Sequence, residues 1–363
     1  MYLTGLKKQI IKMRFSMIIA MCAGIFLAGF SPAAFAKEVA DNDITSHIET
    51  EFWADNAVPS NALDVSTSNG VVTLSGSVDN VLAKDRAQDI TEATVGVRSV
   101  VNRISVMPPY TLTDYEIQKS VEKALLNDPA ADSYEIDVKV SDGVVKLTGE
   151  VDSWQEKQLS TTVAKGVKGV VDVQNDIDVD YKTERTDYEI QQEVKKRLAS
   201  DVRVDDALID VNVKNDKVIL TGTIGSLQEK NRARSDALVG CVDSFDTVGL
   251  KVKWWARDEM TRKKLYVSRT DEEIKQAVKD SFVYDPRVYS FNIDVSVDYG
   301  TVTLSGVVDN LKAKKAAERD AKNTMGVYRV INNIKVRPAV IPSNDELKQR
   351  VSKAILDDPY VER

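Results

Sequence analysis

Histidine and cysteine are nearly absent from this chain of 363 residues, which contains one histidine and two cysteines. Metal sites built from histidine or thiolate ligands need several of these side chains, and a serine–histidine triad would have to use His47. His47 lies beside an apolar position of a predicted helix, where a solvated side chain is a better interpretation than a general base. We therefore expect no enzyme activity, no metal site and no cofactor.

Acidic residues are absent from positions 1–36, whereas this end of the chain has four basic residues: Lys7, Lys8, Lys12 and Arg14. An apolar run over 15–30 follows, which is short for a membrane span of about 20 residues, and a small-x-small sequence ends at Ala36. These features predict a signal peptide over 1–36, cleaved after Ala36, and a periplasmic mature chain. A lipoprotein acylated at Cys22 is the alternative, although Met21 stands where a small residue is expected.

Basic residues are outnumbered by acidic ones after residue 36. The whole chain has a net charge of −7, and removal of the four basic residues above leaves about −11. Duplex nucleic acid needs a basic surface, so we expect no nucleic-acid partner. Cys241 is the one cysteine left after cleavage, which excludes an intrachain disulfide. It is either a small buried residue or the site of an intermolecular bridge.

What the chain does have is a fourfold repeat. Four predicted hairpins end in Leu-x-Gly, and their final glycines are 73, 73 and 84 positions apart, at Gly76, Gly149, Gly222 and Gly306. A repeat of this period indicates several small copies of one module, each with its own hydrophobic core. Small separate cores leave the outer surfaces of the modules as the places where function can reside.

Each module begins with an amphipathic helix and continues with a hairpin. Capping boxes of the form S/T-x-x-E precede most of the helices, and apolar stripes at i, i+4 and i+8 follow. The stripes are Ile44, Ile48 and Phe52; Ile117, Val121 and Leu125; Ile190, Val194 and Leu198; and Ile274, Val278 and Phe282. The hydrophobic period then changes from 3.6 to 2, and the tight turns are Asn69-Gly70, Asp142-Gly143, Asn215-Asp216 and Tyr299-Gly300.

A second helix and a closing strand complete the module. Three glycines are candidate C-caps of the second helix: Gly96, Gly169 and Gly326. The third copy has Val242 at this position, which predicts a shorter second helix and a longer loop there. We therefore predict an α+β fold of four tandem α-β-β-α-β modules, each a three-stranded sheet with two helices on one face, and a partial fifth module.

The capped helix, the G-x-V-x-L-x-G hairpin and the late Gly-Val…Val-x-Asn-x-Ile-x-Val strand resemble the BON domain. The resemblance covers about residues 41–337, and it depends on fourfold recurrence in one order because no single motif is specific. That family has an α-β-β-α-β fold and includes osmotically inducible periplasmic proteins of Gram-negative bacteria. The resemblance implies binding rather than catalysis, in protection of the envelope during stress, with phospholipid or envelope surfaces as the proposed target.

The repeats and their flanks give a set of expected boundaries. They are a signal peptide (1–36), repeats over 41–107, 112–180, 185–253 and 270–337, a basic-aromatic linker (254–269), and a partial fifth repeat that contains helix 1 only (343–363). This last helix has a stripe of its own, formed by Leu347, Val351 and Ile355. Because a lone helix of this length is marginal in water, either it docks on the fourth repeat or the sequence is truncated, and we favour truncation.

One segment, 251–269, is basic against the acidic background, with seven basic and two acidic residues. Basic groups interleaved with aromatic rings suit an anionic headgroup surface, because the charges attract and the rings settle at the interface. The candidate membrane contact is therefore Lys251, Lys253, Trp254, Trp255, Arg257, Arg262, Lys263, Lys264 and Tyr266. The alternative is a linker whose tryptophans pack against a neighbouring repeat.

These observations predict an exported, non-catalytic binding protein that associates peripherally with anionic phospholipid or another envelope surface under osmotic stress. Two alternatives stay open. The first is a chaperone-like or structural protein that binds other envelope proteins. The second, which only the resemblance suggests, is a small-cation binding module.

Overall fold

The computed structural model describes residues 39–109, 111–128, 130–131, 136–181, 183–257, 269–289, 291–338 and 341–361. The predicted signal peptide and its cleavage site lie outside these residues. Among the helices that are described, none combines the length and the apolar character needed to cross a lipid bilayer.

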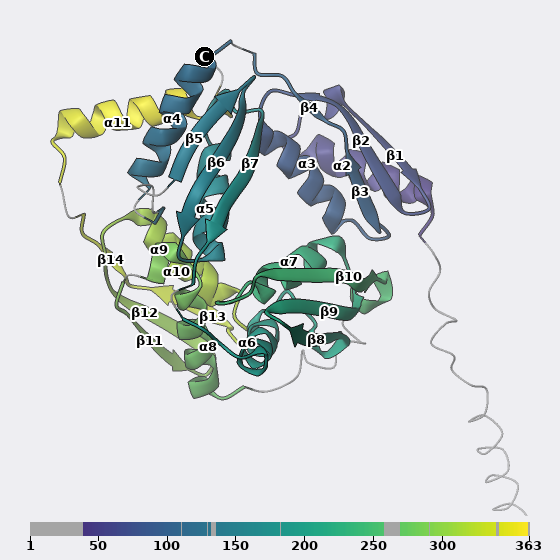
Figure 1. Ribbon diagram of the computed structural model, residues 1–363, viewed down its shortest axis with the longest axis vertical. Coiled ribbons are helices and arrows are strands. Elements are labelled where there is room, and N and C mark those ends of the chain that lie inside the picture. The colour runs from purple at the N-terminus through teal and green to yellow at the C-terminus, as the bar shows by residue number, and fades with distance from the viewer. Residues whose placement is uncertain are drawn as a thin grey trace, which may run out of the picture. The chain divides into compact units, whose positions relative to one another are not determined.

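Four repeats follow one another along the chain (Figure 1). Repeat 1 contains α2 (Asp41–Ala54), β1 (Leu63–Ser68), β2 (Val71–Val78), α3 (Val81–Ala93), β3 (Ser99–Asn102) and β4 (Ser105–Val106). Repeat 2 contains α4 (Asp114–Asn127), β5 (Ile136–Ser141), β6 (Val144–Val151), α5 (Trp154–Lys165) and β7 (Asp172–Val179). Repeat 3 contains α6 (Asp187–Ser200), β8 (Ile209–Lys214), β9 (Lys217–Ile224), α7 (Leu227–Ala237) and β10 (Ser244–Val252). Repeat 4 contains α8 (Asp271–Val283), α9 (Pro286–Tyr289), β11 (Ile293–Asp298), β12 (Thr301–Val308), α10 (Leu311–Lys322), β13 (Arg329–Asn332) and β14 (Lys335–Val336).

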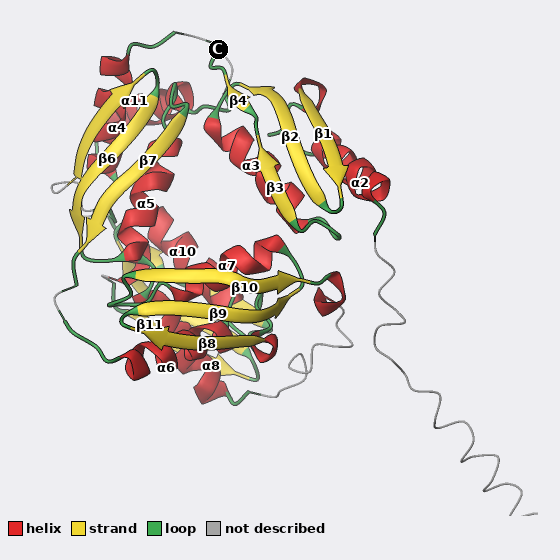
Figure 2. Cartoon of the chain, turned by 45° about the vertical axis from the view of Figure 1, so that its right-hand side comes forward, coloured by secondary structure: helices red, strands yellow, loops and turns green. Residues whose placement is uncertain are grey.

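The second hairpin strand is the middle strand of every sheet. It pairs antiparallel with the first hairpin strand and parallel with the closing strand. The closing strand is split in two in repeats 1 and 4, so those sheets have four strands and the other two have three. Figure 2 shows the sheets of repeats 1, 2 and 3 with helices packed against them. The predicted α+β fold of four small helix-covered sheets is therefore confirmed.

Each repeat has its own hydrophobic core. All twelve predicted stripe residues of the four first helices are buried. The cores touch at a few side chains, since Val81 of repeat 1 packs in the core of repeat 2 and Tyr284 of repeat 4 packs against that of repeat 3. Apolar burial within each repeat therefore forms the fold, as the short repeat period predicts.

The hairpin turns have positive φ at both central residues, for example 52° at Asp142 and 75° at Gly143, as their sequences predict. Each first helix begins with an aspartate whose carboxylate accepts hydrogen bonds from both turn N–H groups. In repeat 2 Asp114 accepts from Asp142 and Gly143, each at 2.9 Å. The same bonds are made in the other repeats by Asp41, Asp187 and Asp271. The hairpin tip is thus tied to the start of the helix.

The helix ends agree with the sequence in part. Capping boxes are present at α4, α6, α8 and α11. Gly96, Gly169 and Gly326 have positive φ, but they lie three or four residues beyond the last helical residue and are not the C-caps. A Cβ at Gly96 would approach the Ile44 side chain to 2.7 Å, so glycine here permits close packing against the stripe as well as the turn.

Repeat 3 departs from the others near its closing strand. Its second helix α7 has 11 residues against 13, 12 and 12 in α3, α5 and α10, which confirms the predicted shortening. The predicted longer loop is wrong, because the loop over 238–243 is no longer than the one over 166–171 in repeat 2. The irregularity lies within β10, where the register against β9 shifts between Asp246 and Gly249 as in a β-bulge.

The partial fifth repeat is the helix α11 (Asn344–Asp357), and its apolar stripe is about half exposed. The ammonium of Lys168 in repeat 2 donates to the carbonyl groups of Leu356 (3.0 Å) and Val361 (3.4 Å). Asn80 of repeat 1 donates to the carbonyl of Pro359 (3.4 Å). These contacts of the C-terminal end go to repeats 2 and 1, whereas the docking alternative expected repeat 4.

Candidate functional site

The predicted membrane contact lies at one end of repeat 3, as far as it is described. Lys251 belongs to β10, Lys253 follows that strand, and Trp254, Trp255 and Arg257 lie in the short 3₁₀ helix η5 (Trp254–Arg257). The remaining four predicted residues lie outside the described residues: Arg262, Lys263, Lys264 and Tyr266. The structure thus brings five of the nine candidates together.

The helix η5 is fixed to repeat 3 through its backbone. The N–H of Lys253 donates to the carbonyl of Ile224 at the end of β9 (2.8 Å), and Ala256 is buried. Gly225 permits this approach, because a Cβ there would lie 2.4 Å from Cγ and 2.9 Å from N of Arg257. The beginning of the predicted linker therefore packs on repeat 3 in a defined position.

The outer side of this turn is basic and partly aromatic. Trp255 is 37% exposed, whereas Trp254 is half-buried. Three basic side chains are exposed around them: Lys251, Lys253 and Arg257. The guanidinium of Arg257 donates to the carbonyl of Ala93 at the end of α3 in repeat 1 (2.7 Å).

A basic pocket of about 340 Å³ lies beside this turn, along the irregular part of β10. Its lining includes Arg98 of repeat 1 and three lysines of repeat 3, namely Lys230, Lys251 and Lys253. Burial lowers the pKa of Lys230, and the positive charge of Lys251 lowers it further. The pocket therefore concentrates positive charge in a protein that is acidic overall.

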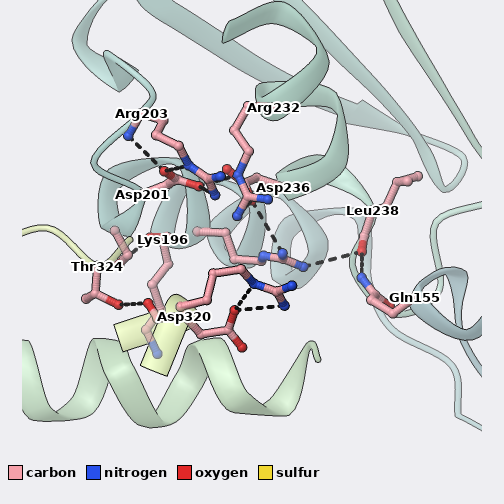
Figure 3. A network of polar contacts seen from close by, with 12 residues as sticks. Gln155, Lys196, Asp201, Arg203, Arg232, Asp236, Leu238, Asp320 and Thr324 are labelled. Atoms are coloured by element: carbon pink, nitrogen blue, oxygen red, sulfur yellow. Dashed lines mark hydrogen bonds and ion pairs between the residues drawn. The ribbon is translucent and has the colours of Figure 1, made fainter. Parts of the chain in front are cut away.

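A second and larger site was not found from the sequence. A pocket of about 440 Å³ lies where helices of repeats 2, 3 and 4 meet, and six acidic and six basic side chains contribute to its walls. The expectation that only outer surfaces remain available was therefore incomplete. Figure 3 shows the ion pairs and hydrogen bonds of this region, which we call the charged interface.

Two aspartates of repeat 3 form the centre of the charged interface. Asp201 accepts from Arg203 (2.9 Å) and from Arg232, which both point toward it (Figure 3). Burial alone would raise the pKa of Asp201, but its hydrogen bonds with Arg203 and the charge of Arg232 outweigh burial and lower it. Asp236 is only 2% exposed; one of its oxygens pairs with Arg232 (3.1 Å) and Arg197 (3.4 Å). Burial dominates there and raises the pKa of Asp236 to about 7.

Repeat 4 contributes a third carboxylate, that of the half-buried Asp320 on α10. Burial raises the pKa of Asp320 to about 7, the nearby charge of Asp285 adds to the shift, and Arg319 opposes it. Arg319 pairs with both carboxylates. This part of the charged interface therefore holds two neighbouring half-buried carboxylates and one exposed arginine.

Backbone contacts also join repeats 3 and 4. An isolated β-bridge pairs Asp201 with Thr324, and the N–H of Met325 donates to the carbonyl of Ser200 (2.8 Å). The Arg197 guanidinium lies 3.9 Å from the ring centre of Tyr284, a cation–π arrangement. Main-chain bonds, a stacked guanidinium and the ion pair of Lys196 with Asp280 (2.7 Å) together join the two repeats.

Repeat 2 contacts repeat 3 through the start of α5. The indole N–H of Trp154 donates to the carbonyl of Val242 (2.7 Å), and the ring packs edge-on against Phe245. The side-chain amide of Gln155 donates to the carbonyl of Leu238 (2.7 Å). These partners lie more than 80 positions apart, so the one available signal was an aromatic residue at the start of a predicted surface helix.

The chemistry of the charged interface is that of a structural junction. Asp201, Asp236 and Asp320 each have an arginine partner, which neutralises most of the buried charge. Within the described residues, no group of three or more histidine, cysteine or acidic side chains is placed to hold a metal ion. The charged interface is suited to holding the repeats together, and its carboxylates with a raised pKa can make the stability of that contact depend on pH.

The BON domain profile matches residues 40–108, 113–181, 186–243 and 270–338. The third match ends before β10, the strand that carries the bulge. The chain is 29% identical over 143 residues to Osmotically-inducible protein Y of Escherichia coli (strain K12), covering 38% of this chain and 71% of that protein.

Two further similarities were found. The chain is 27% identical over 191 residues to the Outer membrane lipoprotein DolP of Haemophilus influenzae, covering 48% of this chain and 97% of that protein. Among solved structures, CdsD, a structural protein of the type III secretion system of Chlamydia trachomatis, is 15% identical with a TM-score of 0.16, covering 57% of this chain and 91% of that one.

Proposed function

This chain belongs to the BON domain family, and on that premise we propose that it is an exported, non-catalytic envelope protein that associates peripherally with anionic phospholipid under osmotic stress. Similarity to an osmotically inducible protein and to an outer membrane lipoprotein supports a role at the envelope. The predicted signal peptide over 1–36 would deliver the chain to the periplasm.

One observation carries the proposal: exposed cations and an exposed indole ring share one turn at the end of repeat 3. Lys251, Lys253 and Arg257 are exposed, and Trp255 lies between the last two in sequence. An anionic leaflet attracts each such cation by about 1 kcal/mol, and an indole ring prefers the headgroup region. Because the turn packs on Gly225 and Ile224, the charges and the ring are presented by a fixed element.

Co-sedimentation with vesicles tests this proposal. We expect binding to phosphatidylglycerol vesicles at low ionic strength, weaker binding as salt is added, and little binding to phosphatidylcholine. Trp254→Ala with Trp255→Ala should weaken binding without unfolding the repeats. The matched control is Trp53→Ala, which removes an 81% exposed ring from the acidic surface of α2. Absence of binding to anionic vesicles at low salt would contradict the proposal.

The stripe of α11 favours a second candidate function, which is binding of other envelope proteins in a chaperone-like manner. Leu347, Val351 and Ile355 are each about half exposed, although the same positions are buried in the other four first helices. Such a surface suits extended apolar segments of a client. If Leu347→Ser with Val351→Ser abolishes suppression of client aggregation while vesicles are ignored by both proteins, this second function replaces the first.

A further inference from the structure

The irregular part of β10 gives repeat 3 a surface that the other repeats do not share. In repeat 2 the ammonium of Lys157 donates to the carbonyl of Ile177, and in repeat 3 Lys230 makes the same bond to Leu250 (3.3 Å). Two residues before Ile177 lies Asn175, whose side chain ties the strand to helix α5. The residue two positions before Leu250 is instead Val248, which lies in the bulge and is 75% exposed.

Two ammonium groups meet at this stretch of strand, and the bulge supplies the acceptor of one of them. Lys230 reaches it from α7 and Lys251 reaches it from β10 itself, donating to the carbonyl of Val248 (3.0 Å). A lysine ammonium has three N–H donors, so one bond to a carbonyl leaves donors for an anion. The nearby carboxylate of Asp246 accepts from the N–H of Val248 (2.9 Å) and lies 3.8 Å from Lys217.

We propose that this pocket, formed by Lys230, Lys251, Lys253 and Arg98, binds a single phosphate group. Two lysines are held by carbonyl oxygens at a backbone irregularity, and two further cations border the same space of about 340 Å³. A phosphate oxygen cluster would relieve the mutual repulsion of these cations, which also contributes to the lowered pKa of Lys230. The bulge distinguishes repeat 3 at this point, because the carbonyl that holds Lys251 belongs to the bulge residue Val248.

The phosphate can be that of a lipid headgroup or a free phosphate ion, since the pocket recognises the chemistry they share. A lipid source of the phosphate rests on the proposed function. It is supported by two exposed side chains, Val248 and Trp255, which lie on either side of the pocket-lining Lys251 and Lys253 along the chain. In that case the headgroup phosphate would enter the pocket while the two apolar side chains meet the interface. This would add headgroup selectivity to simple charge attraction.

The test compares two doubly substituted full-length proteins that lose the same charge from repeat 3. Lys251→Gln with Lys253→Gln removes two pocket cations, and Lys195→Gln with Lys214→Gln removes two exposed lysines that do not line the pocket. Binding to phosphatidylglycerol vesicles is measured by co-sedimentation. Binding of inorganic phosphate is measured through backbone amide NMR shifts at Gly249 and Lys253. Thermal unfolding verifies that both variants are folded.

The proposal expects the pocket variant to lose about tenfold or more in vesicle affinity and the control to lose about threefold or less. Phosphate should shift the two amides in the unsubstituted protein and in the control, but not in the pocket variant. Shifts with phosphate but no vesicle binding would support a free-phosphate site and overturn the proposed membrane role. Equal losses in both variants without phosphate shifts would overturn the pocket and leave membrane association standing. Absence of both kinds of binding would overturn both.

Discussion

The carboxylate of Asp128 in repeat 2 accepts a hydrogen bond from the guanidinium of Arg287 in repeat 4 at 3.1 Å. An aspartate follows the first helix in every repeat, and in the other three its cation comes from the same repeat, as in Asp55 with Arg86, Asp201 with Arg232 and Asp285 with Arg319. Repeat 2 has Leu159 at the position of Arg86 and Arg232, counted from the helix N-cap. The buried Asp128 is therefore neutralised across repeats, by Arg287 and by Lys312 (2.9 Å).

Removal of Arg287 should loosen this junction. Arg287→Gln leaves the buried Asp128 with Lys312 alone, and we expect the free energy of unfolding to fall by about 2 kcal/mol, since loss of a partner of a buried charge is costly. Arg86→Gln is the matched control, because its pair with Asp55 is more exposed and should contribute less than about 1 kcal/mol. Urea unfolding measures both. Equal losses in the free energy of unfolding would show that the contact between repeats stabilises the chain no more than the exposed pair within repeat 1 does.

The link between the helix start and the hairpin tip gives a second prediction. Asp114→Ala removes two hydrogen bonds to the turn N–H groups of Asp142 and Gly143 and should destabilise the chain by about 1–2 kcal/mol. Asp137→Ala changes an exposed strand aspartate and should have a smaller effect. Hydrogen exchange at Gly143 is the specific measurement, because its amide loses its partner in the first variant alone. Unchanged protection of that amide in Asp114→Ala would contradict this role.

The features of the fold that could be predicted from the sequence are those that depend on short local patterns. Capping boxes, stripes such as Ile117, Val121 and Leu125, and turns with positive φ each follow from a few neighbouring residues, and the structure confirms them. The partner of Asp128 was not predictable, because an aspartate after a helix reads as a turn residue and nothing local indicates a cation 159 positions away. The bulge in β10 was also missed, since Val242 at the aligned glycine position suggested a longer loop instead.

The charged interface should make stability depend on pH between 8 and 5.5. The pKa of Asp236 and of Asp320 is raised to about 7 in the folded protein, against an ordinary value near 4 in the unfolded chain. The folded state therefore binds these protons more tightly, and the stability contributed by both groups grows as pH falls through 7. The lowered pKa of Asp201 acts in the opposite direction, but only at lower pH, near the ordinary aspartate value.

Urea unfolding at pH 8.0 and at pH 5.5 measures this dependence. The unsubstituted protein should gain stability on acidification, and Asp236→Asn with Asp320→Asn should lose most of that gain because the substituted side chains do not titrate. Asp137→Asn, on an exposed strand position, should keep the gain. A gain that is the same in all three proteins would show that these two carboxylates do not cause it.

Substitution of Gly225 tests whether vesicle binding depends on the position of η5, because this helix packs closely against that glycine. A Cβ at Gly225 would lie 2.9 Å from N of Arg257 and 3.1 Å from the carbonyl carbon of Ala256, so Gly225→Ala must displace this turn and the indole of Trp255 with it. Gly240→Ala is the control, since the nearest atoms to its Cβ lie 3.9 Å away. We expect Gly225→Ala to shift tryptophan emission to longer wavelength and to weaken vesicle binding several-fold, while Gly240→Ala changes neither.

A different outcome would separate the membrane contact from the position of this turn. If Gly225→Ala shifts the emission but neither substitution weakens vesicle binding, the membrane contact does not depend on how repeat 3 holds the turn. The contact would then have to be made by charge alone, because only a directional ring insertion requires a fixed backbone.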